Sequence, residues 1–141
     1  MRTEIFPGKF SVLNQIGDFY ATAASEAGLD DQASYDVQLA VDEAVANIIE
    51  HAYGGEGIGD VECSYEIHPE KLIILIRDKG KSFSMRNVEA PDLDSDPCKR
   101  KPRGLGLHFM RSLMDTLEFS FNGGSNLLTM EKFRVNATAP S

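Results

Sequence analysis

Three short clusters of polar residues and glycines in this sequence could carry chemistry. In the first, "DEAVANIIEHAY" (42–53), Glu43, Asn47 and His51 follow one another at intervals of four residues. On a helix this spacing stacks the three side chains along one face. A carboxylate one turn from an amide suits a site for Mg²⁺ and phosphate, because an amide oxygen can ligate Mg²⁺ and a carboxylate can take a proton from a nucleophile. The polar face of an ordinary amphipathic helix gives the same pattern and is the commoner case for these residues taken alone.

The second cluster, "RDKGKSF" (77–83), stands where an apolar run ends. Asp78 could accept a hydrogen bond from an exocyclic amino group such as that of adenine. Gly80 would let a planar ring approach the backbone, because it has no side chain. Asp-x-Gly is also common in turns, so this second signal is weak by itself.

The third cluster, "RGLGLHFM" (103–110), places Gly104 and Gly106 at the start of an expected helix. Free N–H groups at such a start bind anions. The helix dipole contributes only about 0.3–1 kcal/mol, so cations such as Arg103 would have to assist. The dinucleotide fingerprint does not fit, because its third glycine is replaced and no strand directly precedes the cluster. A P-loop does not fit either, because no Gly-Lys-Ser/Thr follows. The alternative is a tight packing turn between loop and helix.

The hydrophobic pattern predicts the elements that must position these clusters. In order, it predicts an edge strand or arm over 1–8, helices over 9–27 and 31–52, strands over 60–68 and 71–78, a long loop over 79–103, a helix over 104–113 and a closing hairpin over 116–135. Strands and helices do not alternate strictly. This order favours an α+β fold over a doubly wound sheet: a two-layer sandwich whose mixed, mostly antiparallel sheet carries helices on one face.

Composition restricts the class of protein further. The 141 residues are 42% hydrophobic, enough for one domain with a core that needs no disulfide or metal. No apolar stretch approaches the roughly 20 residues of a membrane span, and the N-terminus lacks a signal-peptide core, so we expect a cytoplasmic protein. The net charge of −8 argues against direct nucleic-acid binding. Cys63 and Cys98 are expected to be reduced thiols, and neither they nor the histidines have zinc-ligand spacing.

The order and spacing of the three clusters are more informative than each cluster alone. A Glu-x-x-x-Asn helix, an Asp-x-Gly at a strand end, a long loop and a Gly-x-Gly that opens a helix together resemble the GHKL-type, histidine-kinase-like ATPase superfamily. "DEAVANIIEHAY" is especially similar to the anti-sigma factor serine/threonine-protein kinases of that superfamily. The resemblance implies one ATPase domain over 1–141, with its core at about 5–135 and an ATP lid at about 84–103.

The resemblance also implies a role for each matched position. Glu43 would be the general base that takes the proton from a serine or threonine of a protein substrate, and Asn47 would coordinate Mg²⁺. Asp78 would bind the adenine amino group, with Gly80 beside the ring. His51 matches a histidine usual in this branch and is expected to be structural. The phosphates of ATP would be held by Arg103, Gly104, Leu105, Gly106 and Leu107.

Two positions depart from the family pattern. Ser82–Met85 stands where the family often has Pro-Phe-Asp-Pro, and Pro102 stands where it often has glycine. Proline fixes φ and removes a backbone donor, so we expect a stiffer lid hinge rather than a loss of ATP binding.

The function that the resemblance implies is an ATP-dependent serine/threonine kinase that acts as an anti-sigma regulatory factor. Such a protein phosphorylates a STAS-type antagonist and binds a sigma factor, and members of this branch often pair as homodimers. A non-catalytic ATP-binding switch remains an alternative, because partner surfaces leave no motif. The ATP-binding half of a histidine kinase is a weaker alternative, because no histidine of this chain sits on a separate dimerisation helix.

Overall fold

The computed structural model describes residues 1–81 and 106–134 of the chain. The elements in chain order are strand β1 (Arg2–Pro7), a 3₁₀ turn (Phe10–Val12), helix α1 (Leu13–Glu26), helix α2 (Asp31–Asn47), the π-turn η2 (Ile48–Ala52), strands β2 (Asp60–Ile67) and β3 (Lys71–Asp78), helix α4 (Gly106–Leu113), and strands β4 (Thr116–Asn122) and β5 (Ser125–Phe133).

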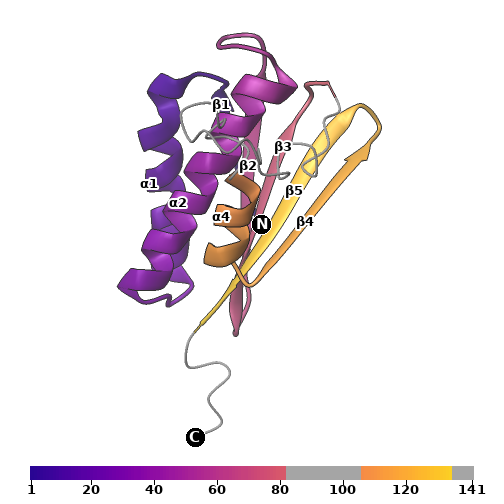
Figure 1. Ribbon diagram of the computed structural model, residues 1–141. Helices are drawn as coiled ribbons and strands as arrows, with labels where there is room; N and C mark the ends of the chain where they lie inside the picture. Colours follow the sequence, from indigo (N-terminus) through magenta and orange to yellow (C-terminus); the bar gives the residue numbers. More distant parts are fainter. Residues whose placement is uncertain (82–105, 135–141) are drawn as a thin grey trace, which may run out of the picture.

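These elements form two layers (Figure 1). The five strands make one sheet in the order β1-β2-β3-β5-β4, and each described pairing is antiparallel. Helices α1, α2 and α4 all lie against the same face of the sheet. The predicted α+β sandwich with helices on one face is therefore confirmed, and β3 is its central strand. The sheet was predicted to be mixed and mostly antiparallel, whereas the five described strands pair only in the antiparallel sense.

The core lies between the sheet and the helices, and strand β3 shows how it is built. Side chains alternate between the two faces of a strand, and in β3 the buried positions are Leu72, Ile74, Ile76 and Asp78. The first three pack in the apolar core. Asp78 is the last member of this inward row, so the alternation that buries the core also carries a carboxylate into the interior.

Most predicted boundaries agree with the structure to within a few residues. Gly28 follows α1 with a φ of +77°, a conformation that ends helices and favours glycine. Asp30 caps the start of α2 by accepting a hydrogen bond from the N–H of Ala33 at 2.8 Å. No helix within 1–81 or 106–134 is long and apolar enough to cross a bilayer.

One prediction was wrong in detail, because the helix expected over 31–52 is not a single α-helix. The α-helical part ends at Asn47 and the chain continues as the π-turn η2, in which the N–H of Tyr53 bonds to the carbonyl of Ile48 at 3.0 Å. A π-turn closes its hydrogen bond over five residues and winds more widely than an α-helix. The backbone hydrogen-bond pattern therefore changes between Asn47 and His51.

Candidate functional site

Helix α2 holds Glu43 and Asn47 one turn apart, as predicted. Glu43 is half-buried, whereas Asn47 has no exposed surface. Neither the Oδ1 nor the Nδ2 atom of Asn47 has a hydrogen-bond partner among the described residues. A buried polar group without a partner costs about 1–3 kcal/mol, so each such group needs an explanation. The explanation that Asn47 belongs to an ordinary solvated helix face does not hold, because that face would be exposed.

A ligand would account for the buried amide. The carboxamide oxygen is a neutral, hard donor of the kind that Mg²⁺ accepts alongside water and phosphate oxygens. Asn47 therefore fits the predicted metal position by its chemistry and its burial.

We expect Asn47→Leu to stabilise the ligand-free protein. Leucine has the same branching and the same number of side-chain heavy atoms but no polar atom, so the free energy of unfolding should rise by about 1–3 kcal/mol. The same change should remove the stabilisation that we expect Mg-ATP to give to the wild type. Thermal denaturation with and without Mg-ATP measures both effects, and Asn14→Leu on the exposed side of α1 is the matched control. If the ligand-free Asn47→Leu protein were less stable than the wild type, the buried amide of Asn47 would not be lowering the free energy of unfolding, and this interpretation would be wrong.

A second group of candidate residues lies at the end of β3. Asp78 is 2% exposed, and its Oδ1 atom accepts hydrogen bonds from the N–H of Gly80 at 2.9 Å and from Nδ2 of Asn126 at 2.8 Å. Burial raises the pKa of Asp78 above its usual value, and the two hydrogen bonds oppose this shift without cancelling it. No described residue donates to Oδ2. The carboxylate therefore has one oxygen fixed by the protein and one that a ligand could use.

Asn126 is a functional candidate that the sequence reasoning missed. It pairs with Asp78 across the β3–β5 ladder, is 1% exposed, and also donates to the carbonyl of Lys81 at 3.1 Å. Its amide thus fixes the orientation of the Asp78 carboxylate. The sequence does contain one indication of its role: Asn126 lies two residues before Leu128 and four before Met130, so on a strand all three side chains point to the same, inward face.

Gly80 lies against the π-turn that follows α2. A Cβ atom at Gly80 would lie 2.6 Å from the carbonyl carbon and oxygen of Ala52, much closer than real Cβ contacts allow. The next N–H, that of Lys81, donates to the same Ala52 oxygen at 3.0 Å. Only glycine permits this approach, so the Asp78–Lys81 turn rests on a segment that begins directly after Asn47.

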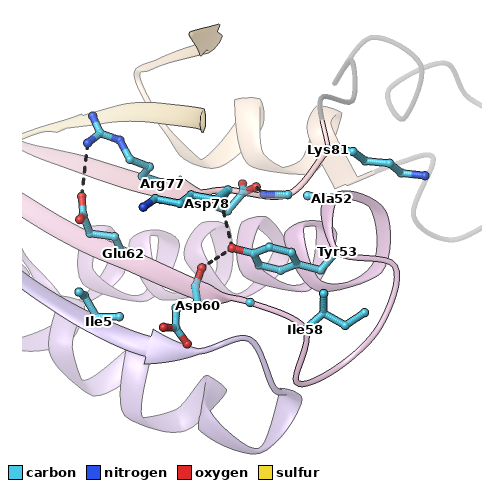
Figure 2. Close-up of a pocket in the computed structure, with 12 residues that line it drawn as sticks. Ile5, Ala52, Tyr53, Ile58, Asp60, Glu62, Arg77, Asp78 and Lys81 are labelled. Carbon is cyan, nitrogen blue, oxygen red and sulfur yellow. Dashed lines mark hydrogen bonds and ion pairs between the residues drawn. The ribbon is translucent and has the colours of Figure 1, made fainter. Parts of the chain in front are cut away.

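A cavity of about 470 Å³ opens beside this turn (Figure 2). Its lining residues are Ile5, Ala52, Tyr53, Ile58, Gly59, Asp60, Glu62, Arg77, Asp78, Lys79, Gly80 and Lys81. An ion pair between Arg77 and Glu62, at 3.6 Å, stands at one side. Glu43 and Asn47 do not line the cavity. The candidate residues therefore form two groups, which the π-turn connects through Ala52 and Tyr53.

The remaining predicted residues belong to the third cluster. Gly106 and Leu107 are the first two residues of α4, so a helix begins at the predicted glycine pair. The predictions that lie outside the described residues concern Arg103, Gly104, Leu105, the lid at 84–103 and Cys98.

Comparison with known proteins agrees with this geometry. Residues 6–132 match the model of the histidine kinase-like ATPase domain family. A serine-protein kinase RsbW of Listeria monocytogenes is 31% identical over 109 residues, which cover 74% of this chain and 69% of the relative. The RsbW kinase of Bacillus cereus is 30% identical over 112 residues, which cover 77% of this chain and 69% of the relative.

Solved structures show the same fold at low sequence identity. The RsbU and RsbW domains of a Mycobacterium tuberculosis protein match with a TM-score of 0.61 at 14% identity, over 94% of this chain and 33% of that one. The histidine kinase AdeS of Acinetobacter baumannii matches with a TM-score of 0.55 at 17% identity, over 96% of this chain and 69% of that one. These structures share the fold, and the family model together with the sequence relatives shows that the chain belongs to the histidine kinase-like ATPase family and, within it, to the anti-sigma factor serine/threonine-protein kinases.

Proposed function

We propose that this protein transfers the γ-phosphoryl group of Mg-ATP to a serine or threonine of a STAS-type antagonist protein, and that it binds a sigma factor when the antagonist is absent. The proposal places both partners, and the reaction, in the cytoplasm. Its single strongest support is the buried amide of Asn47, which has no described partner and lies one helical turn from a half-buried carboxylate.

In this proposal, one group of residues binds the adenine and another binds the phosphates and Mg²⁺. Asp78 would accept a hydrogen bond from the adenine amino group through Oδ2, while Asn126 and the N–H of Gly80 hold Oδ1. At the other end Asn47 would ligate Mg²⁺, which neutralises charge on the phosphates. Gly106 at the start of α4 would donate its backbone N–H group to a phosphate oxygen.

Glu43 would act as the general base. The substrate hydroxyl oxygen forms a bond to the γ-phosphorus, the bond from that phosphorus to the bridging oxygen of ADP breaks, and the hydroxyl proton passes to the Glu43 carboxylate. A positioned base contributes about 10²–10⁴-fold to such a transfer.

Nucleotide affinity should depend on pH through Asp78. The carboxyl must be ionised to accept the adenine hydrogen bond, and its pKa in the folded protein lies above the usual 3.8. Affinity for ADP should therefore fall as the pH decreases through this raised pKa, at a higher pH than for an exposed aspartate. Asn126→Ala removes a hydrogen bond that lowers the pKa, so it should move the loss to still higher pH.

Calorimetric titration with ADP from neutral to mildly acidic pH measures this profile. Asp18→Asn, which removes an exposed carboxylate on α1, is the control and should leave the profile unchanged. The assignment of Asp78 would be contradicted by profiles that coincide for the wild type and Asn126→Ala.

The test of the proposed function is phosphotransfer. The purified chain is incubated with labelled Mg-ATP and its cognate STAS protein, and acid-stable label on a serine or threonine of that protein is expected. Binding of ATP without any transfer would favour the non-catalytic switch instead. Acid-labile label on this chain itself would favour the histidine kinase alternative.

A further inference from the structure

Three consecutive backbone N–H groups follow Asp78, and each has a different acceptor. The N–H of Lys79 donates to the hydroxyl of Tyr53 at 3.0 Å, that of Gly80 donates to Oδ1 of Asp78 at 2.9 Å, and that of Lys81 donates to the carbonyl of Ala52 at 3.0 Å. The first and third acceptors belong to adjacent residues at the end of the π-turn η2. The turn that carries Asp78 is therefore attached to the chain segment directly after α2.

Of these two hydrogen bonds from the turn to the end of η2, only the bond to Tyr53 involves a side chain, because Ala52 accepts through its backbone carbonyl. Its hydroxyl accepts from Lys79 and donates to the carbonyl of Asp60, where β2 begins (Figure 2). A tyrosine hydroxyl ordinarily keeps its proton at neutral pH, and burial raises the pKa of Tyr53 further, so the hydroxyl can make both bonds. One side chain thus joins the end of η2, the start of β2 and the end of β3.

The surrounding backbone is shaped to the Tyr53 ring. A Cβ atom at Gly59 would lie 2.4 Å from Cε1 and 2.5 Å from Cζ of the ring, and 2.8 Å from the hydroxyl oxygen. The φ of Gly59 is not positive, so its backbone conformation does not require glycine. The absence of a side chain at Gly59 is explained by the ring that occupies that space.

We propose that Tyr53 is a positioning residue that holds the Asp78–Lys81 turn at a fixed place relative to Asn47 on α2. The inference rests on the proposed function, because it assigns Asp78 and Asn47 to the two ends of one bound nucleotide. A nucleotide that must contact both residues binds more weakly when their separation changes. Tyr53 itself touches neither the reacting phosphate nor the substrate hydroxyl in this scheme.

The experiment compares Tyr53→Phe with the wild type at a temperature where both are folded. Loss of the hydroxyl removes two hydrogen bonds, and we expect the Kd for ADP measured by calorimetry to rise about tenfold. In the phosphotransfer assay we expect KM for ATP to rise by a similar factor while kcat stays within about twofold of the wild type, because the reacting groups are unchanged.

Tyr20→Phe is the matched control. The Tyr20 hydroxyl likewise has two hydrogen-bond partners in the main chain, because it donates to the carbonyls of Ser64 and Leu75 at 3.1 Å each, but it is buried in the core. This variant should lose stability and keep the wild-type Kd. Gly59→Ala is a second probe of the same idea: it should displace the ring and weaken ADP binding, whereas Gly17→Ala, with open space around its Cβ, should not.

The outcomes separate this inference from the proposed function. If the wild type binds ADP and Tyr53→Phe binds it equally well, the positioning role is wrong and the proposed function stands. Equal weakening by Tyr53→Phe and Tyr20→Phe would also overturn the positioning role, because it would show a general loss of stability. If the wild type does not bind ADP, the proposed function is wrong and the role of Tyr53 in it falls as well.

Discussion

Asp78→Asn is expected to weaken ATP and ADP binding about a hundredfold, equivalent to about 3 kcal/mol. Oδ1 of residue 78 receives two hydrogen bonds from the protein, from Gly80 and Asn126. An asparagine that keeps its oxygen in that place must turn its NH₂ group toward the nucleotide. A donor would then face the adenine amino group, which is itself a donor, and the charge that strengthened the original bond would be lost.

The same variant should fold at least as stably as the wild type at neutral pH. Because the folded-state pKa of Asp78 is raised above 3.8, this carboxyl favours the folded state below that pH, and the benefit is lost as the pH rises through the folded-state pKa. Replacing it by a neutral amide removes the unfavourable ionised form. Calorimetry should therefore show a lower affinity for ADP, whereas thermal denaturation without ligand should show an equal or higher melting temperature. This combination distinguishes a lost ligand contact from a damaged fold.

Asp18→Asn controls for the loss of one negative charge, since Asp18 is exposed on α1. It should leave both the ADP affinity and the melting temperature near the wild-type values. If Asp78→Asn bound ADP as tightly as Asp18→Asn does, Asp78 would not be the adenine ligand.

The fold was predictable because its layers follow from short-range patterns. The continuous apolar run of β3, the glycine after α1 and the "NGGS" turn each indicate a local conformation, and Gly123 and Gly124 in that turn do adopt positive φ. Strand order was less accessible, because β3 pairs with β5 across a separation of about fifty residues. The π-turn after Asn47 was missed because a single turn of π-helix and a single turn of α-helix bury the same apolar residues, so the hydrophobic pattern does not distinguish them.

The candidate site was predictable in its residue types but not in its connections. Spacing located Glu43, Asn47, Asp78 and Gly80, yet no pattern along the chain shows that Asn47 is wholly buried or that Gly80 packs on Ala52. Both facts depend on tertiary packing. Asn126 and Tyr53 were missed for the same reason, since their significance lies in bonds to residues 48 and 26 positions away.

Glu43→Gln is expected to reduce phosphotransfer to the STAS protein by about 10²–10⁴-fold, because glutamine has the shape of glutamate but cannot accept the substrate proton. Affinity for Mg-ATP should stay within about threefold of the wild type, since the adenine and metal contacts are assigned to other residues. The loss should therefore appear in kcat and leave KM for ATP almost unchanged.

Glu50→Gln is the matched control for this change, because Glu50 lies seven positions further along and is exposed. It removes the same charge by the same substitution and should keep the wild-type rate. Equal rates in Glu43→Gln and the wild type would mean that the transfer proceeds without a base at this position. A Glu43→Gln protein that binds Mg-ATP normally, still binds the sigma factor and transfers phosphate about 10²–10⁴-fold more slowly would separate catalysis from sequestration. That combination is expected, because the proposed function assigns the proton to one side chain of α2 and assigns the nucleotide to Asn47 and the distant turn at Asp78.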